Sequence, residues 1–191
     1  MVLSPKFEEA LIYATRVHAG QMRKKTRVPY IGHLLGVTAI AMEYGANETE
    51  AIAALLHDAV EDCGGVPRQR EIEEIFGPAV GEIVAGCTDS DQEPKPPWRE
   101  RKEKYIAHLA SASASIWLVS AADKLHNSQA IVHNLRAEGD AVWTRFKGGK
   151  EGALWYYRAL VTAFRRHGDS ALINELDRVV TQMEDLADGR V

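Results

Sequence analysis

The sequence is poor in cysteine, in long apolar runs and in positive charge. Its 191 residues include two cysteines, Cys63 and Cys87, without a CxxC spacing, which favours reduced thiols over a disulfide framework. No apolar run approaches the length of a membrane span. The formal net charge of −4 argues against general nucleic-acid binding, because that activity needs a broad basic surface. Any anionic ligand must therefore be bound by a local group of residues.

The N-terminal residues also lack the features of a secretory signal. Between Met1 and Glu9 the only basic residue is Lys6, and no long apolar stretch is present. The hydrophobic share of 46% and the charged share of 26% are ordinary for a globular protein. We therefore expect a cytoplasmic protein with no membrane partner. The length suits a single domain over residues 1–191, and the sequence leaves the oligomeric state open.

Helical periodicity covers most of the chain, and no segment requires a strand. Ser4 before Pro5 is an N-terminal helix signal, and Asn47 with Glu50 has the spacing of a capping box. A loop over 88–97 contains three prolines and is a candidate insertion over a cleft. The fold class is therefore expected to be all-α, a single helical bundle. The predicted helices are 5–18, 31–44, 48–63, 68–76, 78–87, 98–109, 115–135, 150–166 and 170–186.

A polar tetrad follows the most apolar segment of the chain. Residues 51–56 are apolar on every side, which implies burial, and His57, Asp58, Glu61 and Asp62 come directly after them. In a continuous helix, residues four apart share one side, so the imidazole and the carboxylates would line up. Buried carboxylates need a partner or a metal ion. The sequence therefore predicts a cation site at the end of this helix.

Two residues outside the tetrad extend this predicted site. His33 lies near the start of the helix 31–44, and Asp123 lies in a polar interruption of the helix 115–135. With His57 and Asp58 they make two imidazoles and two carboxylates, a set that suits Mn²⁺, while Zn²⁺ or Fe²⁺ is also compatible. Imidazole must be neutral to bind a metal, so metal affinity should weaken at acidic pH.

Three segments carry a family resemblance: Tyr30-Ile31-Gly32-His33, residues 57–62 and residues 122–127. They resemble the HD hydrolase domain of RelA/SpoT-homologue alarmone enzymes. The basic pair Arg23-Lys24 and the later segment Leu154-Trp155-Tyr156-Tyr157 also look like that family's nucleotide-site elements, in the same order along the chain. The likeness covers about residues 5–167. No synthetase domain is present, so the chain is most similar to the stand-alone small alarmone hydrolases, including the metazoan SpoT homologues.

The resemblance implies a metal-dependent HD-domain phosphohydrolase that acts in the stringent response. Such an enzyme cleaves the 3′-pyrophosphate from the nucleotide (p)ppGpp and releases GDP or GTP and pyrophosphate. The implied Mn²⁺ ligands are His33, His57, Asp58 and Asp123. The implied catalytic residues are Glu61 and Asp62, which would orient or activate water, and Asn127, which would orient water or substrate. The implied substrate contacts are Arg23, Lys24, Asn127, Tyr156 and, more weakly, Lys150.

The sequence departs from the family pattern at two places. Leu34 stands where proline commonly follows the first metal histidine, but His33 is still available. Ser128-Gln129 stand where many relatives place an arginine, which puts one phosphate contact and the choice of substrate in question. The same site could therefore act on (p)ppApp or as an NADPH 2′-phosphatase. A non-catalytic nucleotide sensor is a further alternative, against which the intact Glu61 and Asp62 argue.

Structural roles compete with several of these assignments. A lone His-Asp pair is a weak signal, and it gains weight only together with His33 and the segment 122–127. A short basic loop such as 23–27 is ordinarily a solvated surface. Tyr156 has helical spacing from Leu160, which is typical of a core aromatic residue.

Overall fold

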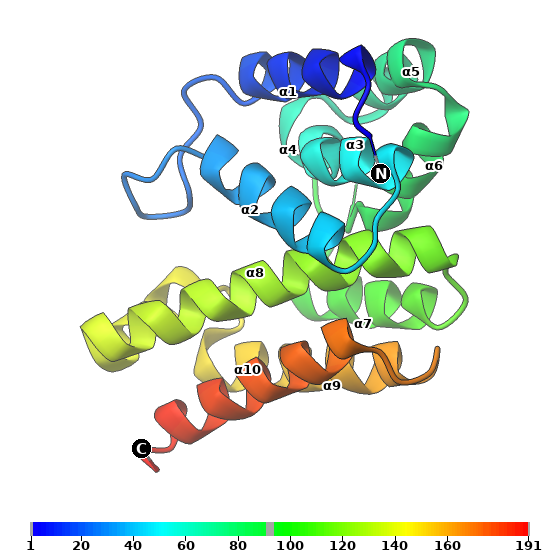
Figure 1. The fold of residues 1–191 in the computed structure, drawn as a ribbon. Helices are drawn as coiled ribbons and strands as arrows, with labels where there is room; N and C mark the ends of the chain where they lie inside the picture. The colour runs from blue at the N-terminus through cyan, green and yellow to red at the C-terminus, as the bar shows by residue number, and fades with distance from the viewer. Residues whose placement is uncertain (1, 91–93, 191) are drawn as a thin grey trace. The chain divides into compact units, whose positions relative to one another are not determined.

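The computed structural model describes residues 2–90 and 94–190. Over these ranges the chain forms α-helices and one 3₁₀ helix, with an isolated β-bridge between Met22 and Pro29 and no longer strand. This confirms the all-α prediction. The elements in Figure 1 are α1 Pro5–Val17, α2 Ile31–Glu43, α3 Glu48–Leu56, α4 Ala59–Cys63, α5 Gly65–Phe76, α6 Pro78–Cys87, α7 Trp98–Leu109, α8 Ala114–Glu138, η1 Gly139–Arg145, α9 Gly149–Arg165 and α10 Ala171–Ala187.

The chain divides into two compact units. Unit 1 comprises Met1–Pro96 and Ala112–Ala122, and so contains α1 to α6 and the first part of α8. Unit 2 comprises Pro97–Ser111 and Asp123–Val191, and so contains α7, the rest of α8, η1, α9 and α10. The expectation of a single domain over 1–191 stays a prediction.

Unit 1 is built around α3. As predicted, α3 begins at a capping box, in which Asn47 and Glu50 each accept a hydrogen bond from the other's backbone N–H. Every residue from Ala51 to Leu56 is buried, and α1, α2 and α6 pack against this helix; α2 and α3 lie side by side in Figure 1. Because this helix has no face exposed to solvent, the residue that follows it, His57, is also buried, at 2% exposed.

The continuous helix predicted over 48–63 is wrong at its centre. Helix α3 ends at Leu56 and α4 starts at Ala59, with His57 and Asp58 in the turn between them. Asp58 has φ −98° and ψ −4°, values in the sparsely populated bridge region where many active-site residues lie. Its carboxylate meanwhile accepts a 2.6 Å hydrogen bond from the Tyr30 hydroxyl. The turn interrupts the register that would place the whole tetrad on one helical face.

Other boundaries differ by smaller amounts. The helix predicted over 68–76 begins at Gly65, the long helix α8 runs three residues beyond 135, and η1 was not predicted. Both cysteines are free thiols, as expected. Residues 91–93 of the predicted loop 88–97 lie outside the described residues. Among the helices described here, none combines the length and the apolar character of a membrane span.

Unit 2 packs α9 against both α7 and α10. Apolar side chains of α9 and α10, Leu160, Phe164, Leu172 and Ile173, are at most 1% exposed. At the surface, Arg158 of α9 pairs with acidic residues of α10.

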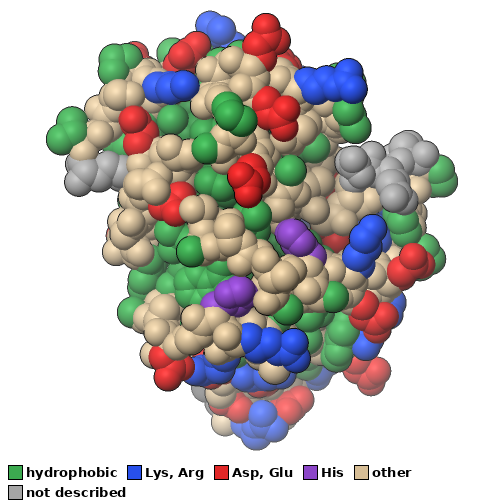
Figure 2. Space-filling view, turned by 90° about the vertical axis from the view of Figure 1, so that its right-hand side faces the viewer, with side chains coloured by type: hydrophobic (Ala, Val, Ile, Leu, Met, Phe, Trp, Pro, Cys, Tyr) green, Lys and Arg blue, Asp and Glu red, His purple; other side chains and the backbone are tan. Residues whose placement is uncertain are grey.

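On the face drawn in Figure 2, basic and acidic side chains are interspersed among the described residues, in line with the net charge of −4.

Candidate metal centre

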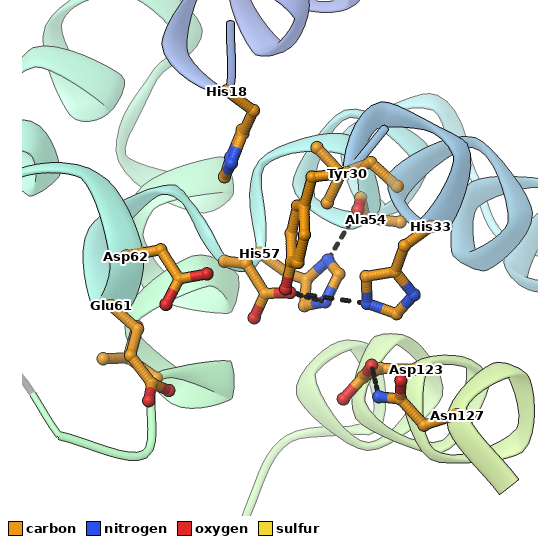
Figure 3. A network of polar contacts seen from close by, with 12 residues as sticks. His18, Tyr30, His33, Ala54, His57, Glu61, Asp62, Asp123 and Asn127 are labelled. Carbon is orange, nitrogen blue, oxygen red and sulfur yellow. Dashed lines mark hydrogen bonds and ion pairs between the residues drawn. The ribbon is translucent and has the colours of Figure 1, made fainter. Parts of the chain in front are cut away.

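Three of the predicted metal ligands come together in unit 1. The Nε2 atoms of His33 and His57 lie 3.4 and 3.0 Å from the same oxygen of Asp58, Oδ2. The ligand atoms of the three residues all lie within 4.8 Å of one another. The imidazole side chains are 1% and 2% exposed, whereas Asp58 is 20% exposed. Helix α2 supplies His33, and the turn between α3 and α4 supplies His57 and Asp58; the rings of His33 and His57 face each other in Figure 3.

Backbone contacts orient the His57 ring. Its Nδ1 lies 2.9 Å from the carbonyl oxygen of Ala54, and this acceptor requires the proton to be on Nδ1. Nε2 of the neutral ring then carries a lone pair directed toward Asp58 Oδ2. A contact of 3.0 Å between two acceptors is unfavourable unless a proton or a cation lies between them. The donor set of two imidazoles and a carboxylate fits a divalent ion such as Mn²⁺, Zn²⁺ or Fe²⁺.

Tyr30 contacts two residues of this cluster. Its hydroxyl donates to Asp58 Oδ2 at 2.6 Å, and its ring meets the His33 ring edge-on with centroids 5.4 Å apart. Tyr30 belongs to the segment 30–33 that carries the family resemblance, but no role was predicted for it. The available signal was its position three residues before His33 at the start of a helix, a spacing that brings side chains together.

Glu61 and Asp62 lie on α4 and have separate partners. Glu61 accepts hydrogen bonds from Lys95 Nζ at 2.9 Å and from the backbone N–H of Asp89 at 3.3 Å. Asp62 accepts one from Gln21 Nε2 at 2.8 Å. Desolvation by the surrounding protein, followed by the charge of Asp58, raises the pKa of Asp62. Their roles in handling water stay predictions.

Asp123 and Asn127 lie in unit 2, four residues apart on α8. Asn127 Nδ2 donates to Asp123 Oδ1 at 2.5 Å, and Lys124 Nζ donates to Asp123 Oδ2 at 2.5 Å. Burial opposes the charge of Lys124, but Asp123 and then Tyr156 and Tyr105 keep the lysine pKa well above its usual value. Asp123 as a fourth metal ligand, and Asn127 as a substrate or water contact, stay predictions.

The predicted substrate contacts occupy both units. Arg23 is half-buried and Lys24 is exposed, in a connection closed by the Met22–Pro29 bridge in unit 1. In unit 2, Tyr156 is 6% exposed and packs near Trp98, with ring centroids 6.3 Å apart. Lys150 donates to the carbonyl oxygen of Ala187, near the end of α10. Binding of substrate by these four residues stays a prediction.

Three further residues with potential roles were not predicted from the sequence: Gln21, Lys95 and Lys124. Gln21 lies 41 residues before the carboxylate that it contacts, and no sequence pattern joins the two. Lys95 was visible only as part of a proline-containing loop. Lys124 is adjacent to Asp123, and consecutive residues do not face each other on a helix, so their ion pair depends on the length of the lysine side chain.

Comparison with known proteins adds a family to this geometry. A family model described as an HD domain matches residues 10–154. The chain is similar to a guanosine-3′,5′-bis(diphosphate) 3′-pyrophosphohydrolase of Danio rerio, with 38% identity over 122 residues that cover 62% of this chain and 65% of the relative. It is also similar to a GTP pyrophosphokinase of Brucella ovis, with 31% identity over 64% of this chain and 16% of the relative. The chain thus spans less than two thirds of these curated relatives.

Two solved structures are similar to most of this chain. One is that of a metazoan orthologue of SpoT described as hydrolysing ppGpp and acting in starvation responses; it has a TM-score of 0.77 and 30% identity, covering 95% of this chain and 97% of that one. The other is a protein of Listeria monocytogenes EGD-e, with a TM-score of 0.70 and 28% identity, covering 83% of this chain and 99% of that one.

Proposed function

Because the chain belongs to the HD-domain family, we propose that it is a divalent-metal-dependent hydrolase that removes the 3′-pyrophosphate of (p)ppGpp. Water and (p)ppGpp would give GDP or GTP and pyrophosphate. The observation that carries the proposal is the cluster of two imidazoles and a carboxylate, whose ligand atoms lie within 4.8 Å of one another. The similarity to relatives named for this reaction supports the choice of substrate.

His33, His57 and Asp58 would hold the metal ion, with Asp123 as a fourth ligand and Mn²⁺ as the ion that we propose. When bound, a divalent cation supplies Lewis acidity, which acidifies water and offsets the negative charge of phosphate oxygens. The hydrogen bond from His57 to Ala54 keeps the ring in the tautomer that can ligate, and Tyr30 fixes the Asp58 carboxylate.

The remaining polar residues would handle water and substrate. Glu61 and Asp62 would orient the attacking water and accept its proton, a task for which the raised pKa of Asp62 brings the carboxylate closer to neutral pH. Asn127 would orient water or substrate. Arg23 and Lys24 would contact phosphates or base, and Tyr156 would pack against the nucleotide. Lys150 is a weaker candidate, because it already binds the end of α10.

The substrate alternatives depend on Ser128-Gln129, the pair that stands where the family resemblance leads us to expect an arginine. Ser128 is fully buried and its hydroxyl donates to the Leu125 carbonyl at 2.9 Å. Ser128 therefore offers no hydroxyl to a phosphate, whereas Gln129 is exposed but carries no positive charge. This observation keeps (p)ppApp and the 2′-phosphate of NADPH as second candidates for the same site.

A product-resolved turnover assay with Mn²⁺ tests these candidates together. We expect pyrophosphate release from ppGpp and pppGpp, with much slower turnover of ppApp and NADPH. Phosphate release confined to NADPH, or pyrophosphate release confined to ppApp, would contradict the proposed substrate. Calorimetric binding of ppGpp without any product over many hours would instead identify a nucleotide sensor.

A further inference from the structure

Asp62 is held by a hydrogen bond from outside its own helix. Gln21 Nε2 donates to Asp62 Oδ2 at 2.8 Å across 41 residues of sequence. Lys95 and Glu61 act on this carboxylate only through their charge in the described structure. The rotation of the Asp62 carboxylate therefore depends on where the Gln21 amide is placed.

The orientation of the Gln21 amide is fixed by its oxygen. Oε1 lies 2.7 Å from Nδ1 of His18 and accepts from the Cys63 thiol at 3.5 Å. Because a carboxylate accepts hydrogen bonds, the amide group that faces Asp62 is the NH₂ and the oxygen faces His18 and Cys63, which places the His18 proton on Nδ1. His18 supports this arrangement from a buried position, 4% exposed, and its other nitrogen, Nε2, has no hydrogen-bond partner among the described residues.

The backbone around Gln21 ties it to the metal cluster. The Tyr30 N–H donates to the Gln21 carbonyl at 2.9 Å, next to the Met22–Pro29 bridge. The His18 and Tyr30 rings stack with centroids 5.2 Å apart and planes 17° apart, and the Tyr30 hydroxyl reaches Asp58. His18 and Tyr30 appear on the same side of the cluster in Figure 3. The segment from His18 to Tyr30 thus contacts both Asp58, a proposed metal ligand, and Asp62.

We propose that Gln21, anchored by His18, is a positioning residue that holds the Asp62 carboxylate in the orientation needed for the attacking water. The inference rests on the proposed function, which assigns that task to Asp62. A neutral amide suits this task, because it fixes the carboxylate without adding the positive charge that would make it a weaker base. Gln21 itself touches neither water nor substrate in this account.

The primary test substitutes Gln21→Met, which keeps the length of the side chain and removes its hydrogen bonds. We expect kcat for ppGpp to fall about 10- to 100-fold, in the range found for residues that orient active-site groups. KM and bound Mn²⁺ should stay within about twofold of wild type, because no substrate or metal contact is removed. Gln69→Met is the matched control: Gln69 also donates to a carboxylate, Glu73 at 2.6 Å, and kcat should not change.

A double-mutant cycle separates positioning from general support of the fold. If Gln21 acts through Asp62, adding Gln21→Met to Asp62→Ala should cause no further loss of kcat. If the two losses multiply, Gln21 acts elsewhere and the proposal is overturned. Should Gln21→Met fail to fold, His18→Phe serves instead, because it keeps the ring stack on Tyr30, replaces a nitrogen without a partner and removes the anchor of the amide; it should lower kcat in the same direction.

A crystal structure of Gln21→Met gives a readout that does not depend on activity. We expect the Asp62 carboxylate to move or to occupy several rotamers while the His33, His57 and Asp58 side chains keep their places. An unmoved Asp62, or a kcat within twofold of wild type, overturns the proposal. If wild-type protein releases no pyrophosphate from ppGpp, the proposed function fails, and the position of Asp62 in the variant still decides whether Gln21 places it.

Discussion

Asp58 in unit 1 and Asp123 in unit 2 are both predicted metal ligands, yet their surroundings differ in charge. Asp58 Oδ2 lies near two imidazole nitrogens, at 3.4 and 3.0 Å, and accepts from a tyrosine hydroxyl. Asp123 instead lies 2.5 Å from the Lys124 ammonium and 2.5 Å from the Asn127 amide. The first carboxylate faces groups that are neutral when they bind a metal, whereas the second faces a resident cation.

The difference shows which part of the predicted site is prepared for an added ion. Around Asp58, the Nε2 atoms of two rings converge on one carboxylate oxygen, and the lone pair of His57 points at it, so a divalent cation would relieve their repulsion. Around Asp123, a lysine that stays protonated already offsets the charge. A metal bound by Asp123 would have to share this carboxylate with Lys124. We therefore expect the unit 1 cluster to supply most of the metal affinity.

The largest expected effect comes from Lys124→Met, which would make Asp123 more like Asp58. The substitution leaves a carboxylate that is 7% exposed without its ammonium, and breaking such a buried pair costs about 3–5 kcal/mol. Urea unfolding of the metal-free protein measures this loss. If Asp123 is a ligand, Mn²⁺ should then stabilise the variant more than the wild type.

Lys102→Met is the control for this comparison. It removes an ammonium that lies 4.8 Å from the centre of the Tyr156 ring, a contact worth about 0.5–2 kcal/mol. Equal stability of the Lys124→Met variant and wild type would show that the pair with Asp123 carries little energy. An equal response of both proteins to Mn²⁺ would remove Asp123 from the metal site.

Next in size is the loss of metal affinity in a pair of matched variants. Asp58→Asn should weaken Mn²⁺ binding by about 100-fold or more, because even residues behind the ligands contribute about 10- to 100-fold. Asp123→Asn should weaken it less, by about tenfold, since Lys124 already competes for that carboxylate. Isothermal titration calorimetry compares the two. A larger loss of Mn²⁺ affinity in Asp123→Asn would contradict the expectation that the unit 1 cluster supplies most of the metal affinity.

Glu61→Gln tests whether Glu61 acts on the attacking water without binding the metal ion. We expect kcat for ppGpp to fall about 100-fold, the usual contribution of a general base, while bound Mn²⁺ is retained. Glu103→Gln, which alters an exposed ion pair with Arg99, should leave both values unchanged. Loss of Mn²⁺ from Glu61→Gln would mean that Glu61 belongs to the metal site.

The smallest effect concerns stability at Asp62. Its raised pKa means that the folded protein disfavours the charged carboxylate, so Asp62→Asn should raise the Tm of metal-free protein at neutral pH. Asp62 nevertheless remains accessible to water, which offsets much of the desolvation, so the gain should be below about 1 kcal/mol. It should shrink as pH falls through the raised pKa and vanish below the unfolded-state pKa, where both states are protonated. A lower Tm at neutral pH would contradict this assignment.

The fold was largely predictable because local signals mark most helix ends. The Ser4 cap and the capping box of Asn47 and Glu50 place the starts of α1 and α3 where the sequence suggested. The break at His57 was not predictable, because the apolar pattern before it continues the helix and the contact between Asp58 and the distant Tyr30 leaves no local sequence signal. The Met22–Pro29 bridge likewise depends on pairing within a segment that has no strand pattern.

The proposed metal ligands could be predicted from the sequence, but the residues that hold neighbouring side chains in place could not. His33, His57 and Asp58 were identified from motif and chemistry, and the structure brings them together. Gln21 was not identified, because its amide reaches Asp62 only through the fold. Residues that orient ligands from far along the chain leave no periodic or motif signal of their own.

The central claim is that the cluster of His33, His57 and Asp58 holds the divalent ion on which hydrolysis depends. Elemental analysis together with ppGpp turnover, on the same samples of wild type, His57→Ala and the exposed control His133→Ala, tests it most directly. We predict bound Mn²⁺ and pyrophosphate release in wild type and His133→Ala, and neither in His57→Ala. Retention of both the ion and turnover in His57→Ala would contradict the account.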